Sequence, residues 1–254
     1  MMRRSALSSA IAALLLAGCG NHQTAQNRTD GLIVARLSEP ISLNPLYLQG
    51  PDAKDIGDLL YSSLTRYDSN EQVVPDIAAA VPTTNNGGIS RDGKRVVFRL
   101  RRDVLWQDGY ALTADDVVFT HRASIDAANA LPSRSLYDPV SSVTACSRYT
   151  VCVTLKRPYA PIVATFFGGD GTPILPKHLL QRYRSLDGAA VNLAPIGSGP
   201  YRVEKWIRGD RLDLVANGSY FRGKPKIARI SIRFVPSHAT ILNQLRSGEI
   251  DATF

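Results

Sequence analysis

Apolar and polar positions alternate from residue 32 onward in a way that predicts short strands interleaved with helices. Short apolar runs bounded by Gly, Pro, Asn or Asp are typical of strands, and they occupy residues 32–37, 96–100, 201–207, 212–216, 230–234 and 250–254. Helical signals occur at residues 54–60, from 113 onward, at 176–181 and between 237 and 248. Because both kinds of element are mixed along the chain, the pattern predicts an α/β fold of mixed α+β type.

The clearest of these helices begins after Thr113. Asp116 stands three positions after the Thr113 hydroxyl and directly before an apolar run, which is the pattern of a capping box. Asp115 and Asp116 in a first helical turn would also complement the helix dipole. An acid–base pair is the alternative interpretation, but adjacent helical residues diverge by about 100° and do not share a target. We therefore predict a structural role for both carboxylates.

The residues before position 32 show a different pattern, that of an export signal. Arg3 and Arg4 precede an apolar stretch at residues 6–17, and small residues stand before Cys19. These features predict a secretory signal peptide over residues 1–18, because the apolar run is shorter than the roughly 20 residues of a membrane span. Leu16–Cys19 resembles the lipobox of bacterial lipoproteins, which implies lipidation of Cys19. The alternative is an ordinary signal with a chance Cys. The polar residues 19–31 predict a flexible tether.

Composition and cysteine usage narrow the classes of function. The chain is 44% hydrophobic and 20% charged, as is ordinary for a globular protein. Its formal charge of +8 is scattered rather than gathered in a stripe, so we expect no nucleic-acid partner. Cys146 and Cys152 lie in a predicted hairpin at residues 143–155, where we expect a disulfide in an oxidising compartment. No His is near them and their spacing matches no zinc pattern, so we expect no metal site.

Motifs of catalysis are weak throughout the chain. The glycine-rich segment Gly197–Tyr201 has neither the ending of a phosphate-binding loop nor the order of a nucleophile elbow. It predicts a tight turn before a strand. The four histidines are far apart in sequence: His22, His121, His178 and His238. We therefore predict no catalytic residue, no cofactor and a protein that is not an enzyme.

Four groups of segments resemble, in the family's order, solute-binding protein family 5, the peptide, dipeptide and nickel class of periplasmic receptors. They cover nearly all of residues 32–254. The segments are Leu43–Tyr47, Leu60–Tyr67 and Val74–Ala78; Asp92–Arg101, Trp106–Gly109 and Leu112–Phe119; Pro158–Pro161 and Ile174–Leu179; Pro195–Tyr201, Tyr220–Pro225 and Leu245–Ala252. Ser198 departs from the family, which usually has Thr at this turn, but a small hydroxyl is kept.

The resemblance implies a fold and an arrangement of domains. Family members are much longer and have two lobes that close around a ligand. Residues 32–254 would correspond to the first lobe of a type II periplasmic-binding-protein fold, here truncated. In such a lobe we expect ligand contacts at Asn44, Leu46, Tyr47, Trp106 and Trp206. For the two Trp residues the alternative is a place in the core or on the lobe surface.

The resemblance also implies a function, a place in the cell and partners. The chain would be the substrate-binding component of an ABC importer, capturing peptides or similar small solutes in the periplasm. It would deliver them to ABC permease subunits while the lipid anchor ties it to a membrane of the cell envelope. A truncated lipoprotein remnant without a transport role, or an interaction protein, is the alternative function.

Overall fold

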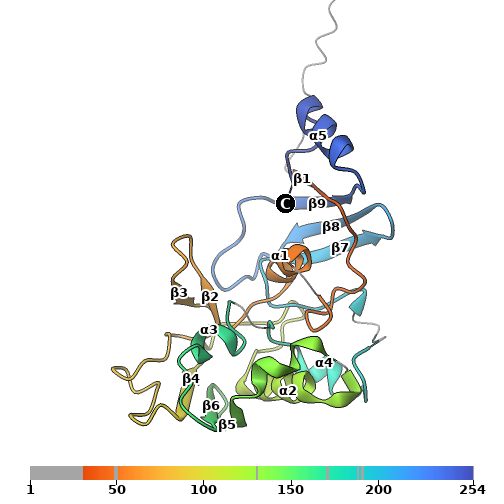
Figure 1. Ribbon diagram of the computed structural model, residues 1–254. Coiled ribbons are helices and arrows are strands. Elements are labelled where there is room, and N and C mark those ends of the chain that lie inside the picture. The colour runs from red at the N-terminus through yellow and green to blue at the C-terminus, as the bar shows by residue number, and fades with distance from the viewer. Residues whose placement is uncertain are drawn as a thin grey trace, which may run out of the picture.

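A mixed sheet and a smaller antiparallel sheet organise the fold and lie in different parts of the molecule (Figure 1). The computed structural model describes residues 31–48, 51–129, 131–169, 172–187, 189 and 192–253. Within these ranges no helix has the length and apolar character that crossing a membrane would need. The helices and strands together confirm the mixed α+β class.

The larger sheet has five strands in the order β10-β1-β9-β8-β7. Strand β1 is parallel to both of its neighbours, β9 and β10, whereas β8 is antiparallel to β7 and β9. Strands from both ends of the described chain therefore lie side by side. Their bounds are Gly31–Arg36 for β1, Tyr201–Ile207 for β7, Arg211–Ala216 for β8, Arg229–Phe234 for β9 and Ala252–Thr253 for β10.

Helices cover this sheet on both sides. On the inner face the fully buried Val34, Leu212 and Ile232 belong to the main core, which helix α1 (Pro51–Leu60) joins. On the outer face helix α5 (His238–Ser247) covers only the part next to β1, where Ala35 packs with Ile241. Helix α5 begins at Ser237, whose hydroxyl accepts a hydrogen bond from the Thr240 N–H, and ends at Gly248.

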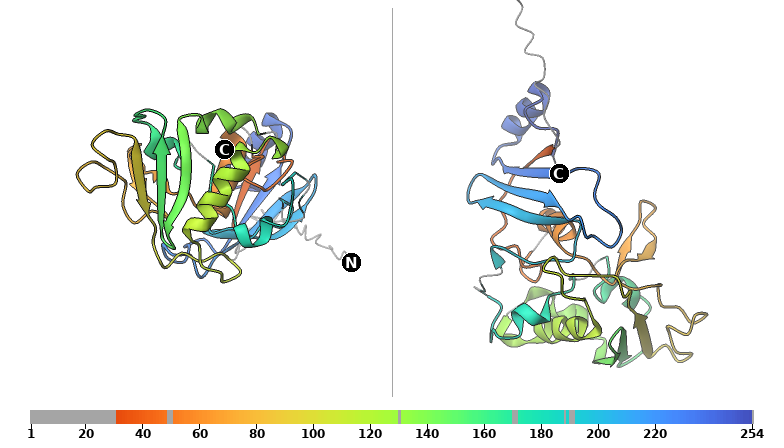
Figure 2. Two further views of the ribbon diagram at one scale, coloured as in Figure 1. Left: turned by 90° about the horizontal axis from the view of Figure 1, so that it is seen from below. Right: turned by 180° about the vertical axis from the view of Figure 1, so that it is seen from behind.

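The part of the molecule that contains the smaller sheet is formed by the chain between α1 and β7. Its three-stranded antiparallel sheet has the order β4-β6-β5, and helix α2 (Ala114–Ile125) packs against β5 and β6 (Figure 2). The strands are β4 (Arg95–Arg99), β5 (Val140–Ser147) and β6 (Thr150–Leu155). The short helix α4 (Lys177–Leu180) lies beside α2. The core here is aromatic, with Phe98, Phe166 and Phe167 fully buried.

Several short elements were not predicted from the hydrophobic pattern. They are β2 (Thr65–Tyr67), β3 (Val73–Pro75), α3 (Ile162–Thr165) and the 3₁₀ turns Ala127–Asn129 and Pro132–Tyr137. Strands of three residues are too short to show an alternating pattern. The β2–β3 hairpin depends instead on Asp68, whose carboxylate accepts hydrogen bonds from the N–H groups of Asn70 and Gln72, both at 2.9 Å.

Candidate functional site

Three of the five residues expected to contact a ligand lie in the interior. Asn44, Leu46 and Trp106 are at most 2% exposed, which leaves no side-chain surface for a ligand. Asn44 has a structural role: its Nδ2 donates to Asn192 Oδ1 at 2.9 Å, and its Oδ1 accepts from the Leu46 N–H at 3.1 Å. These three residues therefore belong to the core of the structure, and a ligand contact by them stays an untested prediction.

Tyr47 and Trp206, the other two, are half-buried. The Trp206 Nε1 donates to Glu39 Oε1 at 2.8 Å, and the Arg208 guanidinium lies 4.2 Å from the centre of the Trp206 ring. These contacts hold the indole against the loop after β1, and both Tyr47 and Trp206 stay partly accessible as residues. A ligand contact by Tyr47 or Trp206 stays a prediction.

The three cysteines fall into two groups. Cys146 and Cys152 are joined by a disulfide, with their Cα atoms 5.9 Å apart, across the β5–β6 hairpin. Cys19 lies outside the described residues, as do the signal peptide expected at 1–18 and the tether up to residue 30.

A cavity of about 450 Å³ lies between α1, β2 and the loop that joins β8 to β9. We call it the polar cavity, because charged, hydroxyl and tyrosine side chains form most of its wall. Its volume is within the range of small-molecule sites. The lining residues are Lys54, Asp58, Tyr61, Ser62, Ser63, Thr65, Arg66, Tyr67, Asp76, Gly169, Pro200, Tyr220 and Arg222.

One wall of the polar cavity depends on the glycine-rich turn before β7. A Cβ atom on Gly197 would lie 1.8 Å from the carbonyl oxygen of Leu60, and one on Gly199 would lie 2.5 Å from the Leu60 carbonyl carbon. The Gly199 N–H donates to that oxygen at 3.0 Å, and the Ser62 N–H donates to Ser198 Oγ at 3.1 Å. The turn therefore packs directly on the backbone at the end of α1, which places Pro200 in the cavity wall.

A second glycine contact sets the position of an aromatic wall. A Cβ atom on Gly169 would lie 2.4 Å from the ring of Tyr67, so the ring lies in close contact with the Gly169 backbone. Only glycine permits this approach. Tyr67 and Gly169 come from parts of the chain about a hundred residues apart, and both line the cavity.

Charged side chains are partly paired in the polar cavity. Lys54 Nζ lies 2.7 Å from Asp58 Oδ2, and Arg222 Nη1 lies 3.4 Å from Asp76 Oδ1. Asp76 is buried, and its Oδ2 accepts a hydrogen bond from the Ser63 N–H at 3.1 Å. Burial raises the pKa of the Asp76 carboxyl, although this hydrogen bond and the charges of the arginines Arg222 and Arg66 act to lower it.

Tyrosines supply the aromatic part of the wall. Tyr61 is 4% exposed, and burial raises its pKa. Burial also raises the pKa of Tyr220, and the nearby Asp76 charge adds to this effect. Both phenols therefore stay protonated at neutral pH. They can donate as well as accept hydrogen bonds, and their rings can pack against a flat ligand group.

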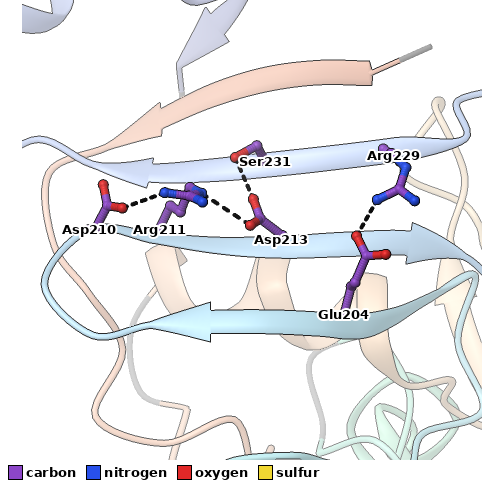
Figure 3. A network of polar contacts seen from close by, with 6 residues as sticks. All are labelled: Glu204, Asp210, Arg211, Asp213, Arg229 and Ser231. Atoms are coloured by element: carbon purple, nitrogen blue, oxygen red, sulfur yellow. Dashed lines mark hydrogen bonds and ion pairs between the residues drawn. The ribbon is translucent and has the colours of Figure 1, made fainter. Parts of the chain in front are cut away.

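A network of ion pairs covers the outer face of the larger sheet (Figure 3). Arg211 lies between Asp210 at 2.6 Å and Asp213 at 3.0 Å. Asp213 also accepts a hydrogen bond from the Ser231 hydroxyl at 2.7 Å. Arg229 forms an ion pair with Glu204 across the strands. A second hollow of about 450 Å³ lies on this face. Its charged groups satisfy one another, which is typical of a solvated surface, so the polar cavity is the stronger candidate site.

None of the cavity residues was singled out as a site from the sequence. They come from five separate segments and carry no motif, and in the described ranges no three His, Cys, Asp or Glu side chains gather closely enough to hold a metal ion. One signal was present: the family-like segments Leu60–Tyr67, Val74–Ala78, Pro195–Tyr201 and Tyr220–Pro225 supply most of the wall.

Comparison with known proteins gives consistent matches over most of the chain. A family model described as bacterial extracellular solute-binding proteins, family 5 Middle, matches residues 72–254. The oligopeptide-binding protein AppA of Bacillus subtilis is 32% identical over 225 residues, which are 87% of this chain and 40% of AppA.

Solved structures show the same likeness. AppA of Bacillus subtilis in complex with a nonapeptide aligns with a TM-score of 0.80 at 30% identity, covering 87% of this chain and 43% of that one. NikZ from Campylobacter jejuni in complex with Ni(L-His) aligns with a TM-score of 0.79 at 32% identity, covering 88% and 43%. The chain thus spans about two fifths of the length of these relatives.

Proposed function

Because this chain belongs to the bacterial extracellular solute-binding proteins, family 5, we propose that it is the solute-capturing component of an ABC importer. Its cargo would be peptides or similar small solutes. The observation that carries the proposal is the likeness to AppA, which includes 87% of this chain in both sequence and structure. The Ni(L-His) complex of NikZ supports the wider term, small solutes, because that cargo is not a peptide chain.

The proposal includes a division into lobes. Residues 32–254 would form the first lobe, and the solute would lie between this lobe and a second one. Closure would remove apolar solute surface from water, which stabilises a complex by roughly 25 cal/mol per Å², and would present a closed shape to the permease subunits. On the first lobe, Tyr47 and Trp206 are the proposed ligand contacts, since both residues are in part accessible.

The proposal also includes a place in the cell. The signal at residues 1–18 would send the chain across the inner membrane, and Cys19 would then carry the lipid that holds it to the cell envelope. Two or more acyl chains anchor a protein far more firmly than one. The Cys146–Cys152 disulfide supports an oxidising compartment such as the periplasm. The mass of the native protein, compared with that of a Cys19→Ser variant, would test the anchor directly.

Binding by the full-length protein, as its gene encodes it, tests the function. We expect pools of short peptides up to nonapeptides to raise its unfolding temperature, because a ligand that binds only the folded state stabilises that state. Single peptides from an active pool would then be titrated by calorimetry. Trp206→Ala should weaken binding if this ring contacts the solute, whereas Arg246→Gln, on the exposed end of α5, serves as the control. An unfolding temperature that no peptide pool and no nickel–histidine complex changes would contradict the proposal.

A further inference from the structure

The polar cavity holds one more positive than negative charge. Its wall has three cations, Lys54, Arg66 and Arg222, and two carboxylates, Asp58 and Asp76. Two of the cations are each paired with a carboxylate, as described above. Arg66 is the third, and the described residues offer it no carboxylate within ion-pair distance.

The guanidinium of Arg66 is also incompletely hydrogen-bonded. Its Nη1 donates to the Tyr67 carbonyl oxygen at 3.1 Å. Its Nε is buried and has no acceptor among the described residues. Buried polar atoms are nearly always paired in folded proteins, so an exception of this kind calls for an explanation. Arg66 is half-buried and lines the polar cavity, so the accessible part of its guanidinium can meet an acceptor supplied from the cavity.

We infer that the polar cavity binds a small molecule with a carboxylate group and an aromatic or hydroxylated body, and that Arg66 contacts the carboxylate. The flat guanidinium fork matches the two oxygens of a carboxylate, which a single ammonium group such as that of Lys54 does not. The carboxylate would also balance the extra positive charge of the wall. The role is distinct from the proposed transport, and its test does not depend on it.

The remainder of the wall fits the body of such a ligand. The Tyr67 ring lies against Gly169, and the rings of Tyr61 and Tyr220 line the same space. Tyrosine rings offer flat apolar surface together with a phenol that can pair with a ligand hydroxyl. The volume of about 450 Å³ suits a molecule of the size of an acylated aromatic amino acid.

Asp76 determines where in the cavity the ligand carboxylate can bind. It holds Arg222 at 3.4 Å and is itself held by the Ser63 N–H. A ligand carboxylate is repelled by the Asp76 carboxylate and attracted to the Arg66 guanidinium, both of which line the cavity. Asp76 is thus a positioning residue, whereas Arg66 is the ligand contact.

Two matched probes test the inference on the full-length protein as its gene encodes it. N-acetyl-L-tyrosine has the carboxylate, and N-acetyl-L-tyrosinamide differs only by the neutral amide in its place. Titration calorimetry should show binding of the acid and at least about tenfold weaker binding of the amide. Equal binding of the two probes, or no binding of the acid up to about 10 mM, would overturn the inference.

Variants assign the binding to Arg66. Arg66→Gln should weaken binding of the acid at least about tenfold and leave binding of the amide unchanged. Arg66→Lys keeps the charge but not the guanidinium fork, so its affinity for the acid should lie between those of the wild type and of Arg66→Gln. Arg246→Gln is the matched control, because Arg246 is exposed on α5 and far from the wall residues in sequence. If Arg66→Gln leaves acid binding intact, or if the control weakens it equally, the assignment is wrong. Circular dichroism and unfolding temperature confirm that each variant is folded.

Discussion

Asp116 and Asp76 are both buried carboxylates, but the regions around them are built in different ways. At the start of α2, Asp116 accepts hydrogen bonds from the backbone N–H groups of Thr113 at 2.8 Å and Lys177 at 2.9 Å. In the polar cavity, Asp76 has one backbone partner, Ser63, and one partly exposed side-chain partner, Arg222. Burial raises the pKa of both carboxyls.

The difference separates a structural carboxylate from one at a binding site. Backbone partners are fixed by the fold, so Asp116 joins α2 to the start of α4 and has little freedom to exchange partners. Asp76 faces a cavity and pairs with a side chain that is about one third exposed, so its surroundings can respond to a ligand. The three predictions below test this contrast, from the largest expected effect to the smallest.

Gly197→Ala should have the largest effect on the free energy of unfolding, because it disrupts the packing of the turn that forms one wall of the polar cavity. The added Cβ would lie 1.8 Å from the Leu60 carbonyl oxygen, which is backbone and has little room to move. We expect the free energy of unfolding to fall by about 4 kcal/mol, in the range reached by severe overpacking and strain. Urea unfolding of the full-length protein measures the change.

Gly218→Ala is the matched control for that variant. Gly218 has open space around its Cα and needs no left-handed backbone conformation. Its substitution should change the free energy of unfolding by less than about 1 kcal/mol. If the two variants were equally stable, the close packing of the Gly197 turn on α1 would be wrong, and with it the position of Pro200 in the cavity wall.

Asp116→Ala should have the next largest effect. It leaves the Thr113 and Lys177 N–H groups without their acceptor in a partly buried place, so we expect a loss of about 2 kcal/mol in the free energy of unfolding. The neighbouring Asp115 pairs with the Lys177 ammonium at the surface, at 2.9 Å. Asp115→Ala should therefore cost less than about 1 kcal/mol. Similar losses for both variants in urea unfolding would remove the distinction between a buried cap and a surface pair.

The same contrast explains what could be predicted from the sequence. The Asp116 region follows from residues three positions apart, because a capping box is a local pattern, and Ser237 and Gly248 at the ends of α5 follow for the same reason. The strands of the larger sheet were also found, since each has its own apolar run. Local signals therefore predicted most of the fold.

The polar cavity could not be predicted in this way. Arg66, Asp76, Gly169 and Arg222 meet only after the chain has folded, and their spacing in sequence has no chemical meaning. The same limit applies to Asn44 and Trp106, which were expected at a ligand and lie in the core. A polar or aromatic residue in a family-like segment serves packing as often as binding, and only its exposed surface tells the two apart.

Asp76→Asn should have the smallest effect, and its dependence on pH is the informative part. At neutral pH we expect the free energy of unfolding to lie within about 1 kcal/mol of the wild type, since the amide keeps the shape and can still accept from Ser63. Because burial raises the pKa of Asp76 in the folded state, the folded protein binds the proton more tightly than the unfolded chain does. Wild-type stability is therefore lost as the pH rises from the unfolded pKa through the folded one. The variant lacks this loss, so its stability relative to the wild type should increase with pH.

Asp68→Asn should show the opposite pH dependence of stability, and it is the comparison for Asp76→Asn. Asp68 is exposed, and the N–H groups of Gln72 and Asn70 lower the pKa of its carboxyl. Its contribution to stability is present above the unfolded pKa and is lost as the pH falls through the folded one. Urea unfolding from about pH 2 to 7 should then show the Asp68 variant losing stability relative to the wild type as the pH rises through the acidic end of this range, while the Asp76 variant gains stability at higher pH. If the pH curves of relative stability were parallel for the two variants, Asp76 would be solvated like Asp68. The polar cavity would then lack the buried carboxylate that positions a ligand anion at Arg66.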